Sequence, residues 1–152
     1  MTNTPPPLPP LPPFTPPPVV PPTFIPPQIP VPQSQPEIVR LVLEKIHRKT
    51  GLFSKVTYRL VVTDRRLIFA LQEKTSVDLI RQSPDITLAQ NPLNFTIPLD
   101  EVRKINTYQA GMDDSSPDTM EVLTNSDKLK FEISNYYKVQ KQLKDVLGAK
   151  VN

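Results

Sequence analysis

Few residues in this chain could perform catalytic or metal chemistry. His47 is the only histidine and cysteine is absent, so paired-histidine and thiolate metal sites have no ligands. The glycines Gly51, Gly111 and Gly148 stand alone, and the sequence contains no phosphate-binding glycine loop and no nucleophile elbow. The sequence therefore predicts a protein that is not an enzyme and that uses no metal or other cofactor.

Acidic residues gather in one short segment, GMDDSSPD, at residues 111–118. Asp113, Asp114 and Asp118 lack the spaced oxygen ligands and the glycine of an EF-hand loop. We expect this segment to be a solvated loop.

Cations instead surround two apolar residues in the segment HRKTGLFSKVTYR, residues 47–59. If residues 38–47 and 56–62 are neighbouring strands, residues 48–55 connect them, with Leu52 and Phe53 in the connection. An anionic bilayer would attract each nearby cation by about 1 kcal/mol, and burial of a Leu or Phe would add about 1.5–3 kcal/mol. The candidate ligand- or membrane-binding residues are Lys45, Arg48, Lys49, Leu52, Phe53, Lys55 and Arg59.

A structural use of the same two residues is the alternative. Leu52 and Phe53 could fold back and close the open end of the domain, with the lysines as ordinary surface residues. The sequence leaves both interpretations open.

The first 36 residues form a different polymer from the rest of the chain. They hold seventeen of the 21 prolines and no charged residue. Proline fixes φ and removes a backbone donor, so this arm is expected to be disordered and to sample polyproline II. It is either a docking ligand for an aromatic-lined groove or a semi-rigid spacer. The candidate docking residues are Leu8, Leu11 and Phe14.

Residues 37–150 are expected to form one mainly β domain. KVTYRLVVT and RLIFA predict two strands joined by a tight turn at residues 63–66, and residues 38–46 fit either a strand or a helix. Thr75 to Asp78 fits a capping box and predicts a short helix ending near Gln82. Further strands are predicted at residues 95–99 and 102–109.

A hairpin and a helix complete the predicted domain. Strands at residues 120–124 and 129–133 flank a polar turn, and Lys128, Lys130 and Glu132 are expected to point to water. Ser134 is predicted to cap a helix that Gly148 ends. Its predicted buried stripe is Tyr136, Val139, Leu143, Val146 and Leu147.

This order resembles the pleckstrin-homology-like (PH-like) superfold, with GRAM and bacterial PH domains as the most similar branches. The segments that carry the resemblance are LVVTDRRLIF at residues 60–69, IPLDEV at residues 97–102, and the hairpin and helix of residues 120–147. The resemblance implies a two-sheet β-barrel or sandwich of about seven strands, capped by a C-terminal helix. It also places the first hairpin loop at the usual lipid-facing edge.

Two departures from that family bear on the ligand. Eukaryotic PH domains usually carry a tryptophan on the last helix, and this chain has none. Their phosphoinositide signature ends in basic-x-arginine, whereas Lys55 and Arg59 are four residues apart. Inositol-lipid recognition is therefore not implied.

Function is expected to be binding. We expect a cytoplasmic adaptor in which the domain binds a protein or peptide partner and the arm docks or spaces a second. The alternative is a peripheral module that binds anionic membrane through residues 45–59. A net charge of +3 is modest for a nucleic-acid binder, and no small-molecule substrate is expected. No signal peptide or spanning segment is evident.

Overall fold

The computed structural model describes residues 2–19, 35–112 and 115–152. The chain divides into two units, residues 1–34 and 35–152, and each is described by itself. Residues 2–19 contain no helix or strand, and the side chains of Leu8, Leu11 and Phe14 are exposed. Residues 1 and 20–34 of the predicted arm, and the predicted loop residues Asp113 and Asp114, lie outside the described residues.

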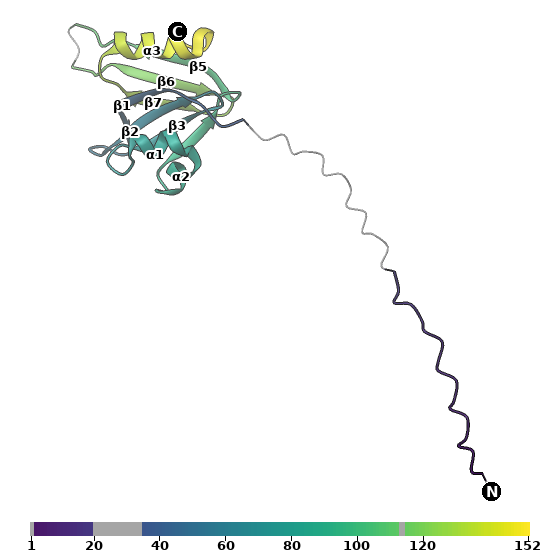
Figure 1. Cartoon of the computed structure of the whole chain (residues 1–152). Coiled ribbons are helices and arrows are strands. Elements are labelled where there is room, and N and C mark those ends of the chain that lie inside the picture. The colour runs from purple at the N-terminus through teal and green to yellow at the C-terminus, as the bar shows by residue number, and fades with distance from the viewer. Residues whose placement is uncertain (1, 20–34, 113–114) are drawn as a thin grey trace. The chain divides into compact units, whose positions relative to one another are not determined.

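The second unit is mainly β, with seven antiparallel strands in one hydrogen-bonded sheet (Figure 1). The strand order is β4-β3-β2-β1-β7-β6-β5. The ambiguous segment at residues 38–46 is therefore a strand. The strands are β1 (Val39–Lys49), β2 (Lys55–Thr63), β3 (Arg66–Leu71), β4 (Phe95–Pro98), β5 (Val102–Tyr108), β6 (Thr119–Thr124) and β7 (Lys128–Glu132).

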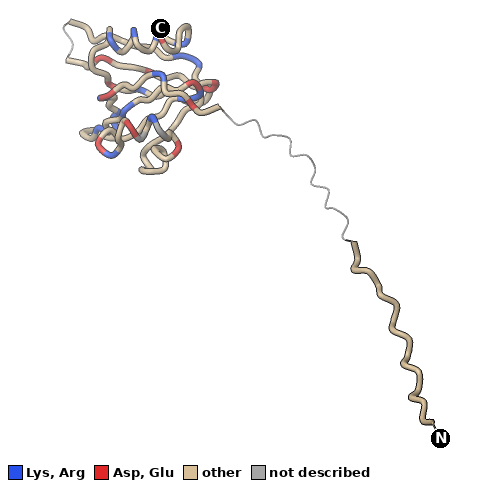
Figure 2. Tube along the Cα trace, viewed as in Figure 1, with Lys and Arg blue, Asp and Glu red and all other residues tan. Residues whose placement is uncertain are grey.

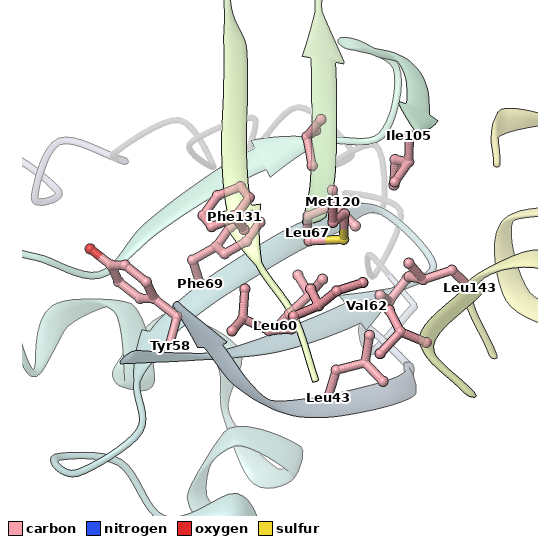
Figure 3. Packing of buried hydrophobic residues seen from close by; sticks show 14 of the residues in the cluster. Leu43, Tyr58, Leu60, Val62, Leu67, Phe69, Ile105, Met120, Phe131 and Leu143 are labelled. Carbon is pink, nitrogen blue, oxygen red and sulfur yellow. The ribbon is translucent and has the colours of Figure 1, made fainter. Parts of the chain in front are cut away.

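The sheet is curled, so that its two halves face each other across one core. The rings of Phe69 on β3 and Phe131 on β7 stack with centroids 4.7 Å apart, although β2 and β1 lie between these strands in the sheet. Figure 3 shows side chains of both halves meeting in this core. A two-sheet β-barrel or sandwich was expected, and the strands form one sheet because β1 joins β7, with His47 and Glu132 as the paired residues.

A bulge in β1 explains its ambiguous periodicity. Strict alternation would send Leu43 and Ile46 to opposite faces, yet both are buried in the same core. The register of β1 against β2 shifts between these two residues, and Lys45 between them has a φ of 58°. The inserted residue turns Ile46 back toward the interior.

Two short helices cover the outer face of the first half of the sheet. They are α1 (Val77–Gln82), as predicted, and α2 (Pro84–Ala89), which was not predicted because Pro84 indicates the end of the first helix and no side chain caps the second. Ile80 of α1 packs with Val61 and Ile68, whose side chains point away from the main core.

The helix α3 (Tyr136–Leu147) covers one end of the curled sheet. Val139 and Leu143 are buried in the main core, which confirms the centre of the predicted stripe. Its N-cap is Asn135 rather than Ser134, since the Asn135 side chain accepts a hydrogen bond from the Lys138 backbone. The helix ends at Gly148, as predicted, with a φ of 57°. A 3-10 turn, η1 (Gly148–Lys150), follows.

The turn between β2 and β3 is tied to the segment that precedes β1. Arg66 donates two hydrogen bonds to the Glu37 carboxylate, at 2.9 and 2.7 Å. Burial alone would raise the pKa of Glu37, but the hydrogen bonds from Arg66 and Thr63 outweigh it and leave the pKa lowered. Arg66 therefore serves the fold.

Candidate functional site

The connection between β1 and β2 is a tight five-residue loop, Thr50 to Ser54. The backbone N–H of Thr50 donates to the Ser54 carbonyl at 3.0 Å, and their hydroxyls lie 3.2 Å apart. A Cβ at Gly51 would lie only 2.8 Å from the Ser54 hydroxyl oxygen. The Ser54 hydroxyl would have to rotate away from such a Cβ. The residues at the tip of the loop contribute nothing to the bonds that close it.

The two apolar residues at the tip point into solvent. Leu52 is 90% exposed and Phe53 is 95% exposed. The alternative in which they fold back over the open end of the domain is therefore wrong. Such exposure of two adjacent large apolar side chains is costly in water, about 1.5–3 kcal/mol each relative to burial.

Aromatic side chains already close this end of the sheet, which explains why the loop is free. Phe69 stacks on Phe95 with centroids 4.7 Å apart, and Tyr58 meets Phe95 edge-on at 5.5 Å. In Figure 3 Tyr58, Phe69 and Phe131 lie at the end of the core away from Leu143 of α3. The guanidinium of Arg48 lies 5.6 Å from the centre of the Phe95 ring and adds a cation–π contact.

Glu132 of β7 binds both lysines that flank the loop. Its carboxylate accepts from Lys55 and lies 3.2 Å from Lys49 Nζ. The hydrogen bond from Lys55 lowers the pKa of Glu132, against the raising effect of burial and with further help from Lys49. The sequence analysis expected Glu132 to point to water, but its side chain is only 11% exposed. Glu132 therefore neutralises part of the positive charge of Lys49 and Lys55 at the base of the loop.

Two of the predicted site residues lie elsewhere. Arg59 is buried, and it donates to the Thr75 carbonyl at 2.6 Å and to Glu44 at 3.0 Å. Lys45 lies in the β1 bulge and lines a cavity with residues of α3. The structure thus brings Arg48, Lys49, Leu52, Phe53 and Lys55 together and leaves Arg59 and Lys45 out.

A groove adjoins the loop along the junction of β1 and β7. Its volume is about 380 Å³, and Lys49 and Lys130 are among the residues that line it. His47 is held at this junction by a 2.9 Å contact between its Nδ1 and the Thr57 hydroxyl. The lining includes His47, Lys49, Thr119, Lys130, Phe131 and Glu132.

Sequence reasoning missed Glu132 and Phe95 as members of this region. Both reach it through pairings between distant parts of the chain, β1 with β7 and β3 with β4. Lys-Phe-Glu at residues 130–132 shows only the alternation of a strand with one face in solvent. This alternation does not indicate which residues of other strands Glu132 contacts.

Neither metal binding nor membrane crossing finds support in the described part of the chain. Within residues 2–19, 35–112 and 115–152, no group of three His, Asp or Glu side chains could hold a metal ion. Over the same residues no helix has the length and apolar character needed to span a bilayer. Comparison of the chain with protein-family models and with curated proteins finds no match.

Proposed function

We propose that residues 37–150 form a PH-like, non-enzymatic binding domain that docks on a protein partner through the tip of the β1–β2 loop. The observation that carries this proposal is the exposure of Leu52 and Phe53, at 90% and 95%. Solvated loop tips in soluble proteins are usually polar, and adjacent exposed large apolar residues mark interaction sites. Partner contact would recover the free energy that their exposure costs.

The charges around the tip favour a protein over a lipid surface. Lys49 and Lys55 share Glu132, and Arg48 is engaged with Phe95, so few cations near the tip are free. An apolar pocket on the partner that receives Phe53 matches this surface. The PH-like architecture is supported by the strand order, the curled sheet and α3 at one end.

The proline-rich arm gives the protein a second binding element, which makes the chain an adaptor. Residues 2–19 have no helix or strand in which their apolar side chains could be buried. A pre-extended polyproline segment loses little entropy when it binds a groove. The arm then brings a second partner close to whatever the domain holds.

The test is co-purification from the source cells of the full chain, its Leu52→Ser/Phe53→Ser variant and a matched control. The control, Ile86→Ser/Leu93→Ser, also removes two exposed apolar side chains, which are 55% and 54% exposed. We expect one set of partners that the tip variant loses and the control keeps. Equal partner sets for all three proteins would contradict the proposal.

A second candidate is docking on an anionic membrane, favoured by the partly exposed Lys49 and Lys55 side chains beside the apolar tip. Co-sedimentation of the full chain with anionic and with neutral vesicles decides between the two. Binding to anionic vesicles alone, lost in the tip variant and weakened by salt, would replace the protein-docking proposal with the membrane one.

A further inference from the structure

The apolar residues at the start of the arm recur at a fixed interval. Leu8, Leu11 and Phe14 are each separated by two prolines, in the run LPPLPPF. A strict repeat of three residues matches neither the period of a helix, 3.6 residues, nor that of a strand, 2 residues. Polyproline II has three residues per turn.

In that conformation the three side chains share one face. Leu8, Leu11 and Phe14 would line up at intervals of about 9 Å, and the prolines would form the other two faces. Their side chains are 91%, 90% and 90% exposed, and the described residues around them contain no helix or strand. The run therefore presents a straight apolar stripe that no helix or strand of the described arm buries.

Charge narrows the kind of groove that could receive this stripe. Residues 1–36 carry no charged side chain, and Figure 2 shows residues 2–19 without Lys, Arg, Asp or Glu. Grooves that require a flanking basic residue or tyrosine would find nothing to bind. A groove that is lined by aromatic side chains and that contacts only apolar groups and the proline backbone could bind this stripe.

We propose that Leu8, Leu11 and Phe14 form a three-point recognition stripe for a partner with an uncharged, aromatic-lined polyproline groove of the EVH1 kind. This inference rests on the proposed docking role of the arm and is independent of the β1–β2 loop. Specificity lies in the three-residue register, so that proline content alone is insufficient for binding.

The experiment titrates a purified EVH1 domain with the full chain and measures the dissociation constant by calorimetry. The decisive variant, Leu11→Pro/Pro12→Leu, keeps the composition of the arm and moves one anchor by a third of a turn. A second variant, Leu8→Ser/Leu11→Ser/Phe14→Ser, removes the stripe. Neither variant touches the folded unit, so loss of binding cannot come from misfolding.

We expect wild-type binding, a loss of about tenfold or more in the exchange variant, and a larger loss in the triple variant. Equal binding of wild type and exchange variant would overturn the proposal, as would no binding of the wild-type chain at millimolar concentration. Concentration-dependent dimerisation that the exchange variant abolishes would overturn it in favour of a second copy. The Leu52→Ser/Phe53→Ser variant should bind as wild type, which keeps this test separate from that of the loop.

Discussion

Two hairpin connections in the folded unit are both closed by local hydrogen bonds, but one has a polar tip and the other an apolar tip. The turn between β6 and β7 is polar, and Thr124 satisfies it by accepting from the Asp127 backbone at 2.8 Å while its own N–H bonds the Asp127 carbonyl. The β1–β2 loop is closed just as locally, by Thr50 and Ser54, yet its tip carries Leu52 and Phe53.

The comparison shows which features of the β1–β2 loop contribute to folding and which do not. Both connections are closed by hydrogen bonds between the residues at their two ends, so an apolar tip is unnecessary for closure. The core does not use it either, because the aromatic side chains of Tyr58, Phe69 and Phe95 close that end of the sheet. An apolar pair that serves neither the turn nor the core is best explained by a contact outside the molecule.

The largest expected effect comes from the aromatic residues beneath the loop. Phe131→Ala should destabilise the full chain by about 3–5 kcal/mol, because Phe131 is 1% exposed and stacks on Phe69. Urea unfolding followed by circular dichroism measures this loss. A cost near that of a surface substitution would mean that the aromatic side chains do not close this end.

Glu132→Gln should have the next largest effect. At neutral pH it removes charge-assisted bonds to Lys49 and Lys55, and we expect a loss of about 1–2 kcal/mol in the free energy of unfolding. The pKa of Glu132 is lowered below its ordinary value of 4.5. Its stabilisation is therefore present above that pH and is lost as pH falls through the folded-state pKa.

The pH dependence gives this prediction its control. Wild type and variant should converge in stability at acid pH, where Glu132 is protonated in the wild type. A difference that stays constant while Glu132 becomes protonated, with its carboxyl signal followed by NMR, would show that the variant acts through packing instead of charge.

The two turns can be compared directly by removing one hydroxyl from each. Thr124→Ala should cost about 1 kcal/mol, because the Thr124 hydroxyl accepts from Asp127 at 2.8 Å. Thr50→Ala should cost less, since its hydroxyl bonds to Ser54 are longer, at 3.2 and 3.4 Å. Thermal unfolding ranks the two. The reverse order would indicate that the β1–β2 loop depends on its side-chain contacts more than its geometry suggests.

The smallest effect on stability is expected where the effect on binding is largest. Leu52→Ser/Phe53→Ser should change the free energy of unfolding by less than about 0.5 kcal/mol, as for other exposed positions. The same urea titration tests this. A loss of 2 kcal/mol or more in the free energy of unfolding would indicate that both side chains are buried in the folded protein.

Much of the fold could be predicted because its signals are local. Alternation along residues 56–71 and 120–133, the apolar spacing of α3 and the glycine at its end each depend on a few neighbouring residues. Residues 38–46 could not be assigned, because the bulge at Lys45 breaks the alternation that identifies a strand. The helix α2 was not predicted, because Pro84 at its start also indicates the end of α1 and no side chain caps it.

The candidate site was predictable only in part, for a different reason. The loop and its apolar tip follow from two neighbouring strands, which the sequence indicates. The pairing of β1 with β7 joins segments far apart in the chain. Neither the ion pair between Glu132 and Lys49 nor the burial of Glu132 could therefore be predicted. Arg59 was included because it is close in sequence, but it is buried and donates to the Thr75 carbonyl, which precedes α1.

The most direct test of the account is photo-crosslinking from the tip of the loop. A benzophenone side chain replaces Phe53 in the full chain, and a control protein carries it at Tyr137, which is also exposed at 67%. After irradiation in the source cells, we predict a discrete protein adduct from position 53 and none of that mass from position 137. Absence of any protein adduct at position 53, or the same adducts from both positions, would contradict the claim that this loop docks on a protein.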